Sequence, residues 1–524
     1  MIKNEKGSTL LVVLLMILVF TILGLTILSA SIGGAKRTEI RKESIVENLD
    51  AIRNLNEAAA YIKKTIKLEY TPEMSIEDYN QMITDKILNN KLNYQITNDR
   101  PDLKEFTRVL LVSSKTPNGQ SYSQTVYITP MPSFLKYAIG SRDVLTINGS
   151  LYIKQGNIYA NKKLEISNQA RYVYNNISKT VNTFFPSVYN KDNNFLFLEN
   201  KNINYCDYRM KNCYNGSTNN TFLPLNISEL KNAFDPHAPI YSNDDSEFVE
   251  VDIIKTFIEK LKNSGIIDPK VRTSNMSNAD LLNLVNTSIS SLYIKGGNND
   301  VQILNSFNNI ENNPLTKNYL YNRDAYIDIN KLTVDKTKWL VINGDAYFEN
   351  IGNDKMDVAA NILVTGNVSI KGNVAFNSTI YVLGKTTINN VNISGLDNGE
   401  LILMTQKDLE IARINKFQNP DSTNLDQVNS IKAFLYTNSA AVVYAIGSYI
   451  YIDGGLFAHG NLEVNAFRGT VPGADSTDLT FVTKSDEKAS RLIIKNNKKL
   501  FINQAQGLPK VDQLEVLTDL MKKD

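Results

Sequence analysis

The first feature of the hydrophobic pattern is an uncharged stretch near the N-terminus, from Ser8 to Ala35. Its apolar part, Leu10–Ile32, is 23 residues long. A helix of that length spans roughly 34 Å, which exceeds the ~30 Å hydrocarbon core of a bilayer. We therefore predict a membrane-spanning helix; a cleaved secretory signal, with Ser29-Ala30-Ser31 as its small-residue run, is the alternative. Lys3 and Lys6 precede the helix and Lys36, Arg37, Arg41 and Lys42 follow it, so the positive-inside rule leaves the orientation open.

Beyond this stretch, apolar residues recur at steps of three to five with charged residues between them, as in an amphipathic helix. They are Ile40, Ile45, Leu49, Ile52, Leu55, Ala59, Ile62 and Ile66. We predict one helix over 8–68 whose first half is apolar and whose second half has two faces. Short alternating runs follow at 91–132, around the turn signal Pro117-Asn118-Gly119, and predict a small antiparallel β region.

A period of six residues dominates 340–395 and returns at 444–464. One apolar set is Val358, Val364, Ile370, Phe376, Val382 and Ile388, and a second is Ile362, Val368, Val374 and Ile380. Six fits a parallel β-helix, in which each side of a rung is a short strand followed by a tight turn. Alternate apolar residues would point inward, and the glycines of a third phase, such as Gly366, would take the corners. A β-sandwich with fortuitous spacing is the alternative.

The expected fold class is mainly β with a long N-terminal α-helix and a parallel β-helix (solenoid) head that carries an inserted α/loop subdomain. We place the first rungs at 133–168, an Asn-rich insertion at 169–335, and the main β-helix at 336–505 with a second insertion at 406–430. The first insertion contains two predicted helices, Glu247–Lys262 and Ser277–Ser291. A C-terminal capping helix is predicted at 506–524.

Composition narrows the chemistry. The 524 residues carry a net charge of +2, so nucleic acid is not an expected partner. There are 66 Asn but only 2 His, and Asn suits turns and stacked ladders rather than acid–base catalysis. Cys206 and Cys213 are the only cysteines, and an exported chain can keep a disulfide between them. Two free thiols or a metal site are the alternatives.

Catalytic motifs are absent from the sequence: it has no Walker loop, Rossmann fingerprint, HExxH or GxSxG. The densest acidic run, Asp235 to Glu250, is interpreted as a solvated loop, and His459 as a surface residue of a rung. Asp300, Asp324, Asp328 and Asp335 lack the spacing of a calcium loop. We therefore expect no enzyme, no cofactor and no metal.

The N-terminal residues Lys3-Asn4-Glu5-Lys6-Gly7-Ser8-Thr9-Leu10-Leu11 resemble a type IV prepilin leader. Over residues 1–65 the chain is more closely similar to PilX-type minor pilins, through Thr21-Ile22-Leu23-Gly24 and Asn56-Glu57-Ala58-Ala59. The resemblance implies that 1–7 is a leader which prepilin peptidase removes between Gly7 and Ser8. Val12 stands where major pilins carry Glu, which favours a minor or tip subunit over one that packs repetitively. The hexads resemble those of bactofilins and hexapeptide acyltransferases.

These resemblances imply a single-pass membrane protein with an extracellular head on the bacterial cell surface. Its function would be type IV pilus-like filament assembly or adhesion, and its partners would be the membrane, prepilin peptidase, other pilin-like subunits and surface glycans. A plain uncleaved anchor is an alternative to the leader. Two other functions are kept as hypotheses: a membrane-tethered β-helix enzyme acting on cell-wall or extracellular polysaccharide, and a bactofilin-like cytoplasmic scaffold.

Overall fold

The computed structural model divides the chain into two compact units, Met1–Thr129 with Leu514–Asp524, and Pro130–Gln513. We call these the helix unit and the head. The described residues are all except 1–5, 72–73, 90–92, 100–106, 130–132, 190–193, 216–217, 220–221, 243–249, 274–275, 309, 311–313, 351–354, 415–416, 419–430, 476, 498–507, 510–513, 520 and 524.

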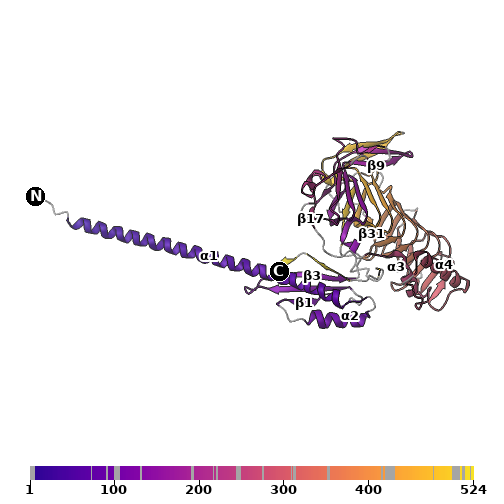
Figure 1. The fold of residues 1–524 in the computed structure, drawn as a ribbon, viewed down its shortest axis with the longest axis horizontal. Coiled ribbons are helices and arrows are strands. Elements are labelled where there is room, and N and C mark those ends of the chain that lie inside the picture. The colour runs from indigo at the N-terminus through magenta and orange to yellow at the C-terminus, as the bar shows by residue number, and fades with distance from the viewer. Residues whose placement is uncertain are drawn as a thin grey trace. The chain divides into compact units, whose positions relative to one another are not determined.

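The helix unit is organised by α1 (Lys6–Glu69), one unbroken helix of 64 residues. The second half of α1 buries a single stripe of residues at steps of three and four: Ala51, Leu55, Ala58, Ile62 and Ile66. This stripe shares a core with Leu110 and Val112 of β2 and with Val126 and Ile128 of β3. The first half of α1 extends away from this core, as the indigo ribbon in Figure 1 shows. The amphipathic pattern therefore marks where the helix meets the sheet.

The sheet of the helix unit is antiparallel, with strand order β1-β2-β3-β38 and β39 beside β3. Its strands are β1 (Gln95–Asn98), β2 (Arg108–Lys115), β3 (Ser121–Thr129), β38 (Glu515–Thr518) and β39 (Lys522–Lys523). Two short helices precede it, α2 (Ile76–Met82) and the π-helix η1 (Ile83–Leu88). Ser75 caps α2 by accepting a hydrogen bond from the backbone N–H of Asp78 at 3.1 Å.

The C-terminal capping helix predicted over 506–524 is wrong in the described residues. Residues 515–518 form β38, which pairs with β3 so that Val516 lies opposite Ile128. Val516 also packs against the core beneath α1. The short apolar repeat fits a strand as well as a helix, and the unsatisfied edge of β3 together with this core decides in favour of the strand.

The head is a parallel β-helix, which confirms the predicted fold class: a long N-terminal helix followed by a mainly β solenoid. Successive hexads lie on successive sides of a rung, and in the middle of the block they pair 18 residues apart. Val364 pairs with Val382 on one side, Ile370 with Ile388 on the next, and Val358 with Phe376 on the third. These side chains are fully buried and belong to one continuous core.

Asn and Asp side chains hold the corners of the stack by bonding to the next rung. Asp324 Oδ1 accepts the N–H of Asp345 at 2.8 Å, Asp345 Oδ1 accepts that of Asn367 at 2.7 Å, and Asn367 Oδ1 accepts that of Lys385 at 3.0 Å. Each corner side chain thus satisfies a backbone donor that the turn leaves without a strand partner. This repeating use explains part of the Asn excess.

Two chain segments build the stack. β33 (Ile450–Ala458) pairs in parallel with β4 (Tyr137–Ser141), and β34 (Leu462–Ala466) pairs with β5 (Val144–Gly149). Figure 1 shows this seam as purple strands beside orange and yellow ones. The rungs that begin at 137 therefore continue the stack that ends at 466.

The outermost strands of one sheet are β17 (Ile240–Ser242) and β18 (Val301–Ile303). The chain between these two strands therefore passes from one end of the stack to the other. It includes the helices α3 (Ile253–Asn263) and α4 (Asn278–Ile294). Helix α3 starts later than predicted because Asp252 caps it, accepting the N–H of Lys255 at 3.0 Å.

The segment predicted as an insertion over 169–335 also contains rungs, which corrects that boundary. β12 (Phe195–Leu198) and β13 (Ile203–Cys206) stack on β7 (Asn157–Ala160) and β8 (Lys163–Ser167). At its other end, β18, β19 (Asn318–Tyr321), β20 (Ala325–Ile327) and β21 (Lys331–Thr333) are strands of the solenoid. The rung of β12 and β13 escapes the hexad pattern because long segments precede β12 and follow β13, whereas β19, β20 and β21 follow one another closely. Likewise β30 (Leu409–Ala412) is a rung strand inside the predicted second insertion at 406–430, most of which lies outside the described residues.

Asn496 connects the end of one head strand to the beginning of β4. It follows β37 (Leu492–Lys495) and is 2% exposed. Its Nδ2 donates to the carbonyl oxygen of Tyr137 at 3.1 Å, with longer contacts to those of Leu135 and Gly454 at 3.4 Å. The side chain of Asn496 therefore ties the end of β37 to the backbone of β4 and β33.

Candidate functional site

The apolar half of α1 is exposed. Between Leu10 and Ile32 its large apolar side chains range from 43% exposed at Val19 to 71% exposed at Leu10. By length and composition this helix is able to cross a membrane, and none of its most apolar window is buried against protein. Exposed apolar surface costs about 25 cal/mol per Å² in water, so this half of the helix requires an apolar environment.

Both threonines of this stretch form hydrogen bonds within the helix. The hydroxyl of Thr21 donates to the carbonyl oxygen of Ile17 at 2.6 Å, and that of Thr26 donates to the carbonyl oxygen of Leu23 at 2.8 Å. Such bonds leave neither threonine hydroxyl unsatisfied in hydrocarbon, where a missing hydrogen bond is costly. The two threonines are therefore compatible with lipid.

Gly7 and Ser8, the predicted processing residues, lie in the first turn of α1, directly before the apolar stretch. The surroundings of their side chains lie outside the described residues. Val12 lies on the same helix and is 51% exposed. The predicted cleavage stays a prediction, and its test is given below.

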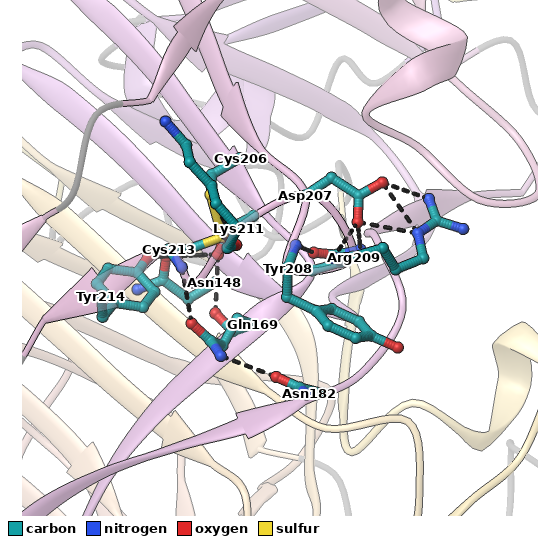
Figure 2. Close-up of a disulfide and its surroundings, with 12 residues drawn as sticks. Asn148, Gln169, Asn182, Cys206, Asp207, Tyr208, Arg209, Lys211, Cys213 and Tyr214 are labelled. Carbon is teal, nitrogen blue, oxygen red and sulfur yellow. Dashed lines mark hydrogen bonds and ion pairs between the residues drawn. A yellow bond between two sulfur atoms is a disulfide. The ribbon is translucent and has the colours of Figure 1, made fainter.

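Cys206 and Cys213, the other predicted pair, form a disulfide in the head (Figure 2), with 5.7 Å between their Cα atoms. Cys206 is the last residue of β13, and both cysteines are at most 1% exposed. The loop between them is held by Asp207, whose carboxylate accepts hydrogen bonds from Arg209 Nη2 at 2.6 Å and Asn168 Nδ2 at 2.7 Å. Burial raises the pKa of Asp207, but these hydrogen bonds outweigh burial and hold that pKa below its usual value.

The disulfide closes a column of buried polar residues on one side of the stack. Cys206 pairs in register with Ser167, Ser167 with Asn148, and Asn148 with Asn465. Asn148 Nδ2 donates to Asn465 Oδ1 at 3.0 Å, and the hydroxyl of Tyr214 donates to Asn148 Oδ1. The sulfur atoms are shielded from solvent, so the disulfide is placed to hold a cover over this column rather than to exchange with thiols.

Gln169 connects the disulfide loop to the neighbouring hairpin. Figure 2 shows its side chain between Cys213, whose N–H it accepts at 3.1 Å, and Asn182, to whose Oδ1 it donates at 2.8 Å. Sequence reasoning found the cysteines and the Asn excess but missed this network. The available signal was the similar local pattern of Leu145-Thr146-Ile147-Asn148 and Leu462-Glu463-Val464-Asn465, but joining the two requires knowing that 462–466 stacks on 144–149.

A buried carboxylate elsewhere in the head was also missed. Glu400 is 8% exposed and accepts a hydrogen bond from Asn497 Nδ2 at 2.6 Å. Burial, and then the nearby Asp453, raise the pKa of Glu400 to about 7, against smaller lowering effects of Asn497, Lys432 and Lys495. Glu400 therefore changes charge near neutral pH.

The head is expected to lose stability as pH rises from about 5 to about 8. The pKa of Glu400 is higher in the folded than in the unfolded chain, so folding favours its protonated form. The resulting stabilisation is fully present below the pKa of the unfolded chain and is lost as the pH rises through the pKa of the folded chain. The loss attributable to Glu400 is up to about 3 kcal/mol. Glu400→Gln should remove this part of the pH dependence in urea unfolding at pH 5 to 8. Glu410→Gln, at an exposed position, should not, and equal pH slopes for wild type and Glu400→Gln would contradict the assignment.

His459, which is predicted to be a surface residue of a rung, has an exposed side chain. Its Nε2 lies 3.7 Å from Glu250, whose carboxylate also accepts a hydrogen bond from Arg142 Nε at 2.5 Å. Glu250 belongs to the acidic run, of which 243–249 lie outside the described residues. Among the described residues no three His, Cys, Asp or Glu side chains form a group able to hold a metal ion.

No protein-family model matches the chain, and no curated protein sequence matches it. Among solved structures, the chain is similar to the competence-associated pilin ComZ from Thermus thermophilus, with 11% sequence identity and a TM-score of 0.31. The match covers 82% of this chain and 84% of that pilin. A TM-score this low does not establish a shared fold, and the function proposed below is therefore argued from the residues of this chain.

Proposed function

We propose that this protein is a membrane-anchored, pilin-like structural subunit of the bacterial cell surface, which acts in the assembly of a type IV pilus-like filament or in adhesion. The observation that carries the proposal is α1. Its exposed apolar half has the length and composition of a membrane span. The helix continues without a break into its second half, which packs on an antiparallel sheet. This combination fits a subunit that is stored in the membrane by its helix and presents a folded domain outside.

The head supports a structural role over a catalytic one. Its buried polar groups are used to hold rungs together, as in the Asn148 column and the Asp324 to Asn367 corner. A disulfide covering a buried column fits an exported domain. The proposed partners are prepilin peptidase, other pilin-like subunits and surface glycans.

The mature protein isolated from membranes is expected to begin at Ser8. Gly7→Asp should block processing and leave Met1 in place, because a charged side chain would occupy the position just before the cut. Mass spectrometry of the N-terminal peptide measures both. Gly24→Ala, in the same helix and with open space around the added methyl group, is the matched control and should be processed normally.

Finding Met1 on the wild-type protein would overturn the leader and leave a plain membrane anchor.

Added protease on intact cells should digest the head. Complete protection of the head, with digestion after lysis, would favour the cytoplasmic scaffold instead.

A further inference from the structure

Four basic residues follow the apolar stretch of α1 within ten residues of its end at Ile32. They are Lys36, Arg37, Arg41 and Lys42, and all four are exposed. We call Lys36 and Arg37 the near pair, and Arg41 and Lys42 the far pair. Within the described part of the chain, none of the four forms an ion pair with a carboxylate. The protein itself therefore leaves these charges open to an external anion.

The position of these residues along α1 matches the depth of lipid headgroups. The hydrocarbon core of a bilayer is ~30 Å thick, and the headgroup layers add roughly 5–7 Å on each side. At 1.5 Å per residue, Lys36 lies about 6 Å beyond Ile32 along the helix axis, and Lys42 lies about 15 Å beyond it. Side chains of a helix lean toward its N-terminus, which here is the side of the bilayer. The flexible stems of Lys and Arg therefore let the near pair enter the headgroup layer and let the far pair reach back toward it.

Charges of opposite sign are separated around the helix in this segment. Arg37 and Arg41 are four residues apart and share one side of α1, at a spacing where like charges disfavour a helix. Glu39 and Glu43 each follow an arginine by two residues, which places them about 200° around the helix, on the opposite side. The arginine side therefore presents positive charge that no neighbouring carboxylate offsets, and a bound anion would remove the repulsion between the two arginines.

We propose that the near and far pairs bind the phosphate groups of anionic phospholipids, in the leaflet at the C-terminal end of the apolar stretch. Lys and Arg bind phosphate oxygens through charge-assisted hydrogen bonds, and each basic residue close to an anionic bilayer adds about a fivefold preference. A lipid is the ligand rather than a soluble phosphate, because the apolar stretch holds these residues at the bilayer surface. The inference rests on the proposed membrane role of α1 and names the class of lipid that this anchor selects.

The test uses the full-length protein reconstituted in phosphatidylcholine vesicles that contain a trace of one spin-labelled lipid. The labelled lipid is phosphatidylglycerol or phosphatidylcholine, with the same labelled chain in both. Electron spin resonance separates lipid that is immobilised against the protein from free lipid, and so gives the association constant of each. At low salt, phosphatidylglycerol should associate about threefold more strongly, because only one of the two leaflets meets the basic residues. This ratio should fall toward one as NaCl is raised from about 50 to about 500 mM, because salt screens the attraction.

Substitutions in the two pairs should have graded effects on this ratio. Lys36→Gln combined with Arg37→Gln should lower the ratio from about three to below about two. Arg41→Gln combined with Lys42→Gln should lower it by less, because the far pair lies farther from the bilayer and the attraction decays within about a Debye length. All four side chains are exposed, so the variants should keep the thermal unfolding of the wild type.

The matched control is Lys63→Gln combined with Lys64→Gln. It removes two exposed basic residues from the same helix, about 46 Å beyond Ile32, and should leave the ratio unchanged. Absence of immobilised lipid of either kind would overturn the membrane anchor and this proposal with it. Immobilised lipid with equal association constants for the two lipids would overturn the lipid preference alone and leave the anchor in place. An effect of the control as large as that of the near pair would do the same.

Discussion

Replacing both Leu18 and Leu25 by lysine is expected to abolish retention of this protein in the membrane. The two side chains lie near the middle of the apolar stretch and are 58% and 61% exposed, so neither is sheltered by protein. A lysine at the centre of a membrane helix costs about 2.5–3.5 kcal/mol, and two together cost about 5–7 kcal/mol. Alkaline extraction of isolated membranes, followed by immunoblotting, measures the retained fraction.

The matched control is the double change Leu18→Met and Leu25→Met, which keeps the helix apolar and should leave retention intact. If the lysine variant stayed in the extraction-resistant fraction, the exposed stretch would not be the anchor. The apolar surface would then need another partner, such as a protein that covers it.

Gly372→Val is expected to destabilise the head by more than about 4 kcal/mol, or to prevent it from folding. Gly372 has φ +83°, and an added Cβ would lie 1.8 Å from the carbonyl oxygen of Asn350 in the preceding rung. The register of β26 (Val368–Phe376) against β28 (Thr386–Gly395) also shifts between Ile370 and Gly372. Backbone atoms of adjacent rungs cannot move apart to admit a side chain without breaking the ladder hydrogen bonds on both sides.

Urea unfolding monitored by tyrosine fluorescence and by resistance to protease measures this effect. Gly473→Val is the control, because an added Cβ at Gly473 meets no atom within 4 Å. An unchanged unfolding midpoint for Gly372→Val would contradict the tight approach of the two rungs at this corner.

Much of the architecture is predictable from local pattern. The length and apolarity of Leu10–Ile32 predict a membrane helix because bilayer thickness alone sets the requirement. The hexads between 340 and 395 predict a β-helix because inward positions and corners repeat with the geometry of each side. Both signals are periodic and short in range, so no distant partner is needed to recognise them.

Three features depend on contacts between residues far apart in the chain. The C-terminal residues become β38 because β3, nearly four hundred residues earlier, offers an edge and a core for Val516. The rungs at 195–206 are recognised only by the strands on which they stack, since their loops hide the period. Asp324 and Asp345 look like scattered loop residues until the stack places each of them against a backbone N–H of the next rung.

The sequence by itself determined the apolar anchor, the continuity of the amphipathic helix and the repeating rung of the head. Only the tertiary structure decided the order of the rungs. Residues 462–466 stack on 144–149, which brings Asn465 beside Asn148, and Asn496 bonds to the backbone of Tyr137 in β4. The physical reason is that apolar rungs of similar shape can stack in many orders. The order adopted is the one in which the buried amides find hydrogen-bond partners, the glycines lie at the tight corners and the disulfide covers the polar column.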